Sequence, residues 1–363
     1  MRTCSNIPCT MMAFVLLLSI LAWHTFVHGA SAPFPFYRYL RADSPLPALV
    51  AYHPTNWDPT QNRYPSRASI RRDLEVLAQA FNGLILYAVD VRVTPLILEE
   101  AIHTGYQAIM LGIWDPRSRQ ELRLAKHLIE KHQSALAFSL IIGNEGIAFH
   151  RYRVHDLNAA ARWMRKTPET ASIPFCTSEP LTVMQHPALF AFGDFLCPNI
   201  HPYWDRPDLS PDQAAQWVRD EAINLARITH KPVLVKETGL PHGGDPRVSL
   251  HHQAAFWSAY LSKERIADIS DDPHIWVAFA AAFEAFDQPW KATQRRLAVE
   301  GCWGILDPHR QSYPAFEIWK RTIRNEPTGG KETEKGTGYF NVAGKLQGRR
   351  ADARPSVVVS GCG

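Results

Sequence analysis

The sequence lacks an excess of charge of either sign. Its formal net charge is +4 at pH 7. One positive charge comes from Arg2 and three come from the segment from Pro327 onward, so the body between them is close to neutral. Nucleic acids and acidic polymers bind to clustered basic surfaces, which a neutral body does not offer. The composition therefore argues against a nucleic-acid partner and suits an uncharged substrate.

The sequence also lacks motifs for metals and phosphates. Its cysteines show no CxxC pair or other metal-ligand spacing, and it has no glycine-rich phosphate loop. We therefore expect neither a metal nor a cofactor. Cys176 and Cys197 fall in consecutive predicted strands and could pair in an oxidising compartment. Buried free thiols are the more common arrangement, and we expect that arrangement for these two residues.

The two ends of the chain differ from its middle. A basic residue precedes an apolar stretch from Met11 to Trp23, and a small-residue cleavage site follows, so residues 1–32 are interpreted as a secretory signal peptide. The alternative is an uncleaved segment that tethers the protein to a membrane. Residues 327–363 contain few large apolar side chains, which predicts a disordered tail. We expect a secreted or periplasmic protein with one folded domain over 33–326.

The middle of the chain alternates short apolar runs with amphipathic segments, a pattern typical of repeated βα units and a parallel sheet. Eight such runs favour an α/β fold of the closed (β/α)8 TIM barrel type over an open doubly wound sheet. The predicted strands are 48–52, 83–87, 108–114, 135–144, 173–178, 195–200, 232–237 and 275–283. Helices are expected between them, among others over 118–131, 211–226 and 314–324.

Two glutamates end buried runs just before glycine-containing turns. Glu145 ends the fourth predicted strand and Glu237 the seventh. Barrel enzymes carry their chemistry at the C-terminal ends of the strands, so both carboxylates are expected at the same mouth. Such a pair is typical of glycoside hydrolysis. The alternative for a single glutamate is a salt bridge to a neighbouring cation, but we expect Lys236 on the opposite face from Glu237 because strand residues alternate.

Other polar and aromatic residues at predicted strand ends are candidates for sugar binding, because sugars bind to aromatic faces with polar groups at the edges. Glu284 and Phe286 share a face of the eighth predicted strand, so Glu284 is expected to reach the cleft, with a buried salt bridge as the alternative. Core packing is the alternative for each aromatic residue, less so for Trp290, which is expected in a loop. The candidates are Tyr52, Tyr87, Trp114, Asn144, His201, Tyr203, Glu284, Phe286 and Trp290.

The sequences around the two glutamates are Ile-Gly-Asn-Glu at 142–145 and Val-Lys-Glu-Thr-Gly-Leu-Pro at 235–241. With these motifs the chain resembles glycoside hydrolase family 17, the β-1,3-glucanases, and especially its bacterial branch. The segment 142–145, Ile-Gly-Asn-Glu, resembles the acid/base motif of that family. The segment 235–241, Val-Lys-Glu-Thr-Gly-Leu-Pro, resembles the nucleophile motif of the family. Other parts of the family pattern are matched by the segments 177–180, 199–204, 283–291 and 301–306. The resemblance implies Glu145 as general acid/base, Glu237 as nucleophile and retention of configuration. The surroundings of Glu145 should then raise its pKa, and Glu237 should stay ionised.

Two positions depart from the family pattern. Leu240 stands where the family often has a tryptophan, and the predicted strand that ends at Tyr87 lacks a common arginine. The missing tryptophan would remove a stacking platform worth about 0.5–1.5 kcal/mol beyond area burial. We therefore expect a change in chain-length or linkage preference, with catalysis retained.

The resemblance implies a retaining hydrolase of β-1,3-glucan, similar to glucan endo-1,3-β-glucosidases, with β-glucan as its partner. A transglycosylase that remodels glucan uses the same carboxylates and is the first alternative. A glucan-binding barrel without turnover is the second, and the intact Glu145, Asn144 and Glu237 count against it. Endo or exo action, exact linkage and oligomeric state stay open.

Overall fold

A computed structural model of the chain describes residues 34–166 and 168–323. The predicted signal peptide or anchor at 1–32 and the predicted tail at 327–363 lie outside these residues. Within the described ranges, no helix combines the length and the apolar character needed to cross a membrane.

Parallel strands form the centre of the molecule. They are β1 (Leu49–Ala51), β2 (Gly83–Leu86), β3 (Ala108–Ile113), β4 (Ala137–Asn144), β5 (Phe175–Ser178), β6 (Val233–Leu234), β8 (Trp276–Ala278) and β9 (Ala281–Ala282), with β7 (Ile266–Asp268) antiparallel to β8. One sheet has the order β5-β4-β3-β2-β1-β9, and a second has the order β6-β8-β7. The chain itself joins β8 to β9, and isolated parallel bridges link β5 through the segment 195–200 to β6. The predicted (β/α)8 barrel is confirmed.

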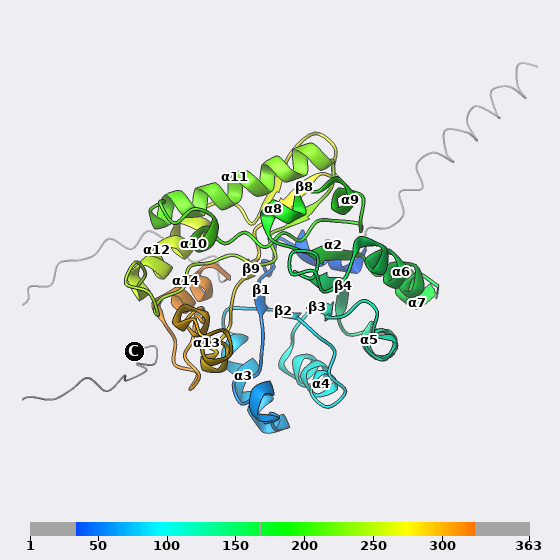
Figure 1. Ribbon diagram of the computed structural model, residues 1–363, viewed down its shortest axis with the longest axis horizontal. Helices are drawn as coiled ribbons and strands as arrows, with labels where there is room; N and C mark the ends of the chain where they lie inside the picture. The colour runs from blue at the N-terminus through cyan, green and yellow to red at the C-terminus, as the bar shows by residue number, and fades with distance from the viewer. Residues whose placement is uncertain (1–33, 167, 324–363) are drawn as a thin grey trace, which may run out of the picture.

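Helices surround these strands (Figure 1). They are α2 (Pro35–Leu40), α3 (Arg67–Leu77), α4 (Thr94–Thr104), α5 (Arg119–His132), α6 (Val154–Met164), α7 (Pro168–Ala171), α8 (Leu181–Met184), α9 (Pro187–Phe190), α10 (Pro202–Asp205), α11 (Pro211–Thr229), α12 (Leu250–Leu261), α13 (Pro289–Arg295) and α14 (Pro314–Ile323), with 3-10 turns η1 (Pro59–Gln61) and η2 (Ala298–Gly301). Helices α3 to α6 follow one another around one side, and α11 lies on the other. The predicted helices at 118–131, 211–226 and 314–324 correspond to α5, α11 and α14.

Two predicted strands differ from the observed ones. The sixth, 195–200, forms only isolated bridges. It contains Pro198, which has no N–H to donate and therefore interrupts a ladder of hydrogen bonds. The eighth, 275–283, is divided into β8 and β9, which belong to different sheets. Strand β7 was not predicted, because its partly exposed residues lack the buried apolar pattern of the parallel strands.

Strand side chains alternate between the barrel interior and the layer under the helices. Leu49, Ile85 and Ile141 belong to an interior cluster, which α2 caps at the N-terminal end of the barrel with the fully buried Phe36. Val50 belongs to the larger outer cluster. Burial of a side chain such as Phe36 contributes roughly 1.5–3 kcal/mol to folding. The interior positions are those that point toward the barrel mouth as the strands end.

Cys176 of β5 and Cys197 of the next segment form a disulfide, with their Cα atoms 6.1 Å apart. The expectation of free thiols is therefore wrong. Both side chains belong to the interior cluster, and neighbouring strands of a barrel bring residues on the same face to the separation that a disulfide requires.

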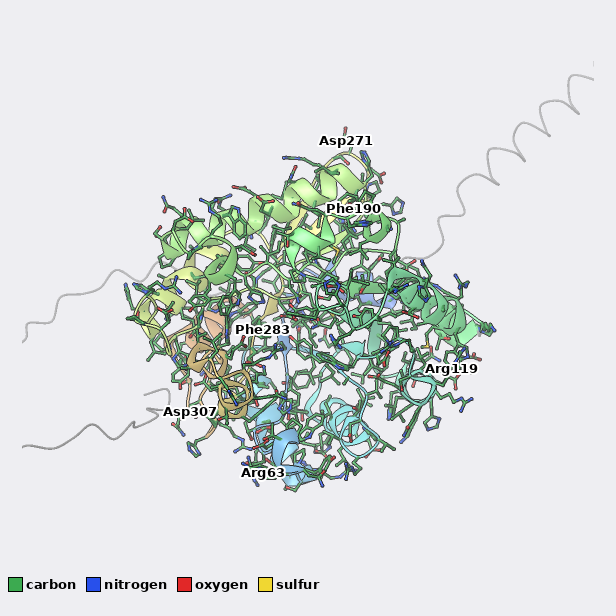
Figure 2. All side chains as sticks on the ribbon, viewed as in Figure 1. Arg63, Arg119, Phe190, Asp271, Phe283 and Asp307 are labelled. Carbon is green, nitrogen blue, oxygen red and sulfur yellow. A yellow bond between two sulfur atoms is a disulfide. The ribbon has the colours of Figure 1, made fainter. Side chains whose placement is uncertain are left out.

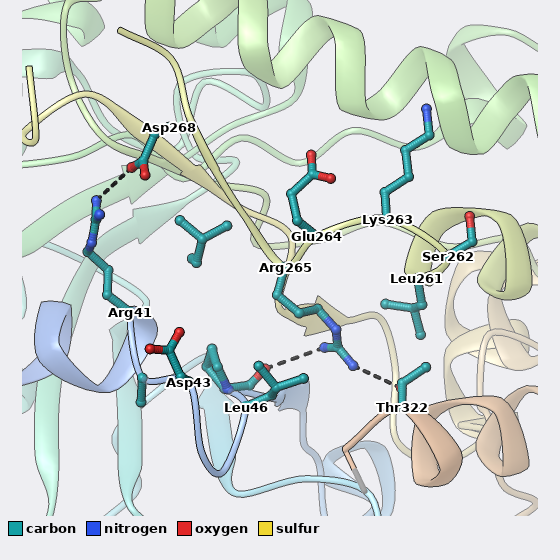
Figure 3. A pocket seen from close by; sticks show the side chains of 13 residues that line it. Arg41, Asp43, Leu46, Leu261, Ser262, Lys263, Glu264, Arg265, Asp268 and Thr322 are labelled. Carbon is teal, nitrogen blue, oxygen red and sulfur yellow. Dashed lines mark hydrogen bonds and ion pairs between the residues drawn. The ribbon is translucent and has the colours of Figure 1, made fainter. Parts of the chain in front are cut away.

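A pocket of about 560 Å³ lies at the N-terminal end of the barrel (Figure 3). It is lined by residues just before β1, such as Leu46, and by Thr322 near the end of α14. The ion pair between Arg41 and Asp268 and the hydrogen bond from Arg265 to Thr322 lie at its wall. Because Glu145 and Glu237 follow the C-terminal ends of their strands, this pocket is not the candidate site.

Candidate active site

Glu145 follows β4 directly and has a left-handed backbone conformation, with φ of +53°. Such a conformation costs roughly 1–3 kcal/mol in a residue other than glycine and persists only where its surroundings impose it. The Glu145 N–H donates to the Ser178 carbonyl at 2.7 Å, at the end of β5. The side chain is held at the mouth by Asn199, whose Nδ2 donates to Oε1 at 2.9 Å.

The turn after Glu145 is fixed by two contacts. Glu179 is fully buried and accepts hydrogen bonds from the N–H groups of Ile147, at 2.9 Å, and Ala148, at 3.1 Å. Burial raises the pKa of Glu179 to about 7, against the effect of these two hydrogen bonds. On the other side, the Gly146 N–H donates to the Tyr152 hydroxyl at 3.0 Å. The turn that carries Glu145 is therefore rigidly supported.

Glu237 lies just beyond β6 and is 4% exposed. His201 Nε2 lies 3.2 Å from its Oε2, and the ammonium of Lys236 donates to its Oε1. The backbone is tied down as well, because the Ile200 N–H donates to the Glu237 carbonyl at 2.9 Å. Both oxygens of this carboxylate thus have partners inside the barrel mouth.

The expectation that Lys236 points away from Glu237 is wrong. Lys236 is fully buried, and its Nζ reaches both Glu237 and Asn144 Oδ1, the latter at 2.5 Å. Regular pairing of β6 ends at Leu234, an interior residue, so Lys236 continues on the interior face. Glu237 lies past the regular strand, where alternation no longer separates neighbouring side chains.

The two glutamates have pKa values shifted in opposite directions. Burial raises the pKa of Glu145, and the negative charge of Glu237 raises it further. Burial would also raise the pKa of Glu237, but the Lys236 ammonium and the contacts with His201 outweigh it and lower that pKa to about 2. Asn199 and His201, the partners of the two carboxylates, are two residues apart, a spacing of roughly 7 Å along an extended chain. One glutamate is set up as an acid and the other as an anion.

Four further predicted residues lie around this pair. Asn144 and His201 make the contacts described above. The Tyr87 hydroxyl is buried beside Glu237, and burial together with the charges of Glu237 and Glu284 raises the pKa of Tyr87. Glu284 is 2% exposed and accepts a hydrogen bond from Lys291 at 2.5 Å on Oε2, while its Oε1 is buried without a partner. Burial raises the pKa of Glu284 to about 7.

Tyr52 and Phe286 are packed in the core, not at the mouth. Tyr52 is 2% exposed, and its hydroxyl donates to Asp73 at 2.9 Å. Phe286 is fully buried, with its ring centre 6.3 Å from that of Tyr52. Tyr52 shares the outward face of Val50, and Phe286 follows the end of β9, so it does not share a strand face with Glu284. Their assignment as substrate-binding residues is corrected to a packing role.

The remaining predicted aromatic residues lie at the periphery of the site. Trp114 is 42% exposed and packs under the Arg151 guanidinium, 3.9 Å from the ring centre. Tyr203 is 7% exposed, and its hydroxyl donates to Asp245 at 2.7 Å. Trp290 lies in α13, not in a loop as predicted, with its ring centre 5.3 Å from that of His53.

Sequence reasoning missed several residues of the site. Lys236, Asn199 and Glu179 contact the two glutamates or their turn. Phe283 and Trp303 enclose His201, with ring centres 5.2 and 5.0 Å away, and Phe283 lies near the centre of the view in Figure 2. Asn199, Glu179 and Phe283 stand at predicted strand ends, and that position was the signal that could have identified them. Trp303 lies beyond all predicted strands and carried no such signal.

The described part of the chain contains no group of three His, Cys, Asp or Glu side chains arranged to hold a metal ion. Leu240, which replaces the tryptophan of the family pattern, is 8% exposed and packs in the outer core cluster. It therefore offers no face to a sugar. The site provides two carboxyl groups whose pKa values are shifted in opposite directions, with buried polar groups around them.

The model of the BtgE/BtgC glycoside hydrolase domain matches residues 50–304. The chain belongs to this family. The probable glucan endo-1,3-beta-glucosidase btgC of Aspergillus fumigatus is 26% identical over 286 residues, which cover 70% of this chain and 40% of the relative. A relative from Aspergillus terreus with the same description is 27% identical and is covered to 44%. The chain thus spans less than half the length of these curated relatives.

Solved structures show the same fold. A family 17 β-1,3-glucanosyltransferase from Rhizomucor miehei has a TM-score of 0.58 and 20% identity, with 75% of this chain and 97% of that chain covered. An active-site mutant of that enzyme was solved with laminaritriose. An endo-laminarinase from Formosa has a TM-score of 0.59 and 16% identity, covering 76% of this chain and 87% of that chain. These likenesses and the family match agree with the resemblance to glycoside hydrolase family 17.

Proposed function

We propose that this protein is a retaining glycoside hydrolase that cleaves β-1,3-glucan. The observation that carries the proposal is the pair of glutamates at one barrel mouth whose pKa values shift in opposite directions, up for Glu145 and down to about 2 for Glu237. A glycosidase needs this division, because one carboxyl group must donate a proton while the other attacks as an anion. The curated relatives named as glucan endo-1,3-beta-glucosidases support the substrate class.

The proposed reaction has two displacements. In the first, a Glu237 oxygen attacks the anomeric carbon, the bond to the leaving oxygen breaks, and Glu145 gives that oxygen its proton. In the second, Glu145 takes a proton from water, the water oxygen attacks the anomeric carbon, and the ester bond to Glu237 breaks. In this reaction Glu284, whose buried Oε1 has no hydrogen-bond partner, and Tyr87, which lies beside Glu237, would bond sugar hydroxyls.

A time course on laminari-oligosaccharides tests this function. Shorter products alone, released with retained anomeric configuration, are expected for the hydrolase. Products longer than the input would establish the transglycosylase instead, in which a sugar hydroxyl replaces water in the second displacement. Cello-oligosaccharides, with β-1,4 bonds, serve as the linkage control and should stay intact. Inversion of configuration, or no turnover of any laminari-oligosaccharide, would contradict the proposal.

We also propose that the protein acts outside the cytoplasm, in the secreted or periplasmic space. The disulfide between Cys176 and Cys197 supports this, because such bonds persist in oxidising compartments. Cell fractionation with an antibody tests it, and a purely cytoplasmic signal would contradict it. The choice between a cleaved leader and a membrane tether is tested in the same fractions by the mass of the mature chain.

The placement in the bacterial branch of family 17 is a further proposal, supported by the two glutamate motifs alone. The curated relatives described above are fungal. A sequence tree that contains both branches tests it, and grouping with the fungal sequences would contradict it.

A further inference from the structure

We propose that Lys236 is a positioning residue that orients Glu237 and Asn144 and sets the acidic limit of activity. The inference rests on the proposed function, because it assigns Glu237 as the nucleophile. Neither the family resemblance nor the relatives assign a role to this lysine. It departs from the expected geometry, since it was predicted on the opposite face of the strand.

The first argument is the coordination of the ammonium. Lys236 is fully buried, and a buried ammonium is costly unless its protons are used. One proton goes to Glu237 Oε1 and another to Asn144 Oδ1 at 2.5 Å. The ammonium also lies 4.4 Å from the centre of the Tyr87 ring, a cation–π distance. Lys236 thus joins the ends of three strands through one charged group.

The second argument concerns the orientation of the Asn144 amide. A lysine ammonium only donates hydrogen bonds, so the atom that Asn144 turns toward it must be the carbonyl oxygen Oδ1. The amide NH₂ then points away from Lys236 and is a donor for a sugar hydroxyl. Lys236 therefore decides which of the two polar ends of Asn144 the substrate meets.

The third argument is the charge around Glu237. Glu145 from the end of β4 and Glu284 after β9 are carboxylates that oppose its ionisation, as burial does. His201, after the segment 195–200, contacts Oε2. Tyr87 from the end of β2 is the remaining titratable neighbour, and Lys291 of α13 is engaged with Glu284. Lys236 is the cation in direct contact with Glu237 Oε1. Without Lys236, burial and the two carboxylates would oppose the ionisation of Glu237, and His201 would be the remaining contact that favours it.

The consequence is a nucleophile that stays ionised in acid and leaves readily. When Glu237 forms the ester to the anomeric carbon, its negative charge is lost and the ion pair with Lys236 is broken. When water cleaves the ester, the carboxylate and the ion pair are restored. Lys236 therefore favours breakdown of the covalent intermediate over its accumulation, while Glu145 passes the proton in both steps.

The variant Lys236→Met removes the charge and keeps the apolar stem. Its kcat/KM should fall roughly tenfold or more at pH 4 relative to its own value at pH 6, because a Glu237 with a raised pKa is largely protonated there. The wild type should keep most of its kcat/KM between these pH values. Lys231→Met is the control, since Lys231 precedes β6 and donates to the Phe192 and Gly193 carbonyls, whereas Glu237 follows that strand. Its pH profile should match that of the wild type.

A uniform loss of activity in Lys236→Met, with no change in the shape of the pH profile, would overturn the proposal.

A second measurement does not depend on glucan turnover or on that variant. In protein labelled with ¹³C at the glutamate carboxyls, the signal lost in Glu237→Gln should titrate well below pH 4 in the wild type. Titration near pH 4.5 would overturn the role of Lys236, whereas a low titration without glucan turnover would overturn only the proposed function.

Discussion

At the scale of the residue, Glu145 and Glu237 are the same side chain given two different properties by their neighbours. Glu237 has a lysine and a histidine in contact, whereas Glu145 accepts a hydrogen bond from the neutral amide of Asn199. Burial and the negative charge of Glu237 raise the pKa of Glu145 against the smaller opposing effects of Asn199, His201 and Lys236. Both are largely removed from water, so these contacts decide which one keeps its proton. This difference supports the proposed roles, with Glu145 as the acid and Glu237 as the nucleophile.

Replacement of the nucleophile tests that assignment. Glu237→Gln should lower kcat on laminari-oligosaccharides by roughly a thousandfold or more, because no carboxylate remains to form the covalent intermediate. Binding should persist, since the amide keeps the shape of the side chain. Isothermal titration with laminaritriose measures the binding. Activity near that of the wild type would remove Glu237 from this role.

The acid/base role predicts a different response. Glu145→Ala should lose most turnover of oligosaccharides but keep turnover of an aryl glucoside with a good leaving group, and azide should restore its rate by replacing water in the second step. Because the raised pKa of Glu145 keeps it protonated, wild-type kcat/KM should decline as pH rises through that pKa, and the decline should vanish in the variant. Failure of azide to rescue would point to a structural role.

At this scale the sequence was sufficient to locate charged side chains that stand at the ends of buried strands. Glu145 and Glu237 are carboxylates that end buried runs, and both lie at the mouth. The aromatic residues carried no such signal, because a tyrosine at a strand end serves packing as well as sugar binding. Tyr52 and Tyr87 occupy equivalent places in the sequence pattern, yet only Tyr87 faces the glutamates.

At the scale of the element, the turn that follows β4 is shaped by close packing. A Cβ added at Gly146 would lie 1.9 Å from the Tyr152 ring, a distance that real Cβ atoms do not show. The same turn holds Glu145 in a left-handed conformation, and two of its N–H groups donate hydrogen bonds to Glu179. The position of Glu145 therefore depends on the absence of a side chain at Gly146.

The variant Gly146→Ala should disturb this turn. Overpacking of this kind costs roughly 1–3 kcal/mol, and kcat should fall because Asn199 no longer meets the Glu145 carboxyl group. Urea unfolding and kcat measure the two effects. Gly243→Ala is the control, because a Cβ there would meet the Cys302 side chain at 3.5 Å, an ordinary contact. Equal behaviour of the two variants would contradict this account.

The ends of strands are also where sequence rules fail. Alternation placed Lys236 and Glu237 on opposite faces, but the paired residues of β6 are only Val233 and Leu234. Beyond them the chain is positioned by bridges such as that between Asn199 and Glu237, and a long lysine side chain reaches its neighbour. The catalytic end of a barrel strand is thus the part that periodicity describes least well.

At the scale of the whole molecule, the strands of the barrel are joined partly by regular ladders and partly by isolated bridges. Regular parallel ladders run from β9 through β1 to β5, whereas the segment 195–200 is joined by isolated bridges. That weakly paired segment carries Asn199 and is followed directly by His201, and these two residues contact Glu145 and Glu237. The disulfide from Cys197 to Cys176 of β5 reinforces it at its start.

Loss of the disulfide should lower the stability of the fold. It closes a loop with a sequence separation of 21, for which the loss of chain entropy predicts about 3 kcal/mol. The double variant Cys176→Ala/Cys197→Ala should lose about this much free energy of unfolding, measured in urea under non-reducing conditions. The single variant Cys176→Ala is the matched control and should lose a similar amount. A double variant as stable as the wild type would contradict the prediction.

The sequence by itself determined the barrel class and the order of its units, and it predicted the two strand-end glutamates as the reacting pair, because periodicity and strand-end carboxylates are local properties of the chain. Tertiary structure alone decided the rest. Whether Cys176 pairs with Cys197, whether Lys236 meets Glu237 and whether Tyr52 faces the core depend on contacts between residues far apart in sequence or past the ends of regular strands. Those contacts arise only when the barrel closes, and they turn two identical carboxyl groups into an acid and an anion.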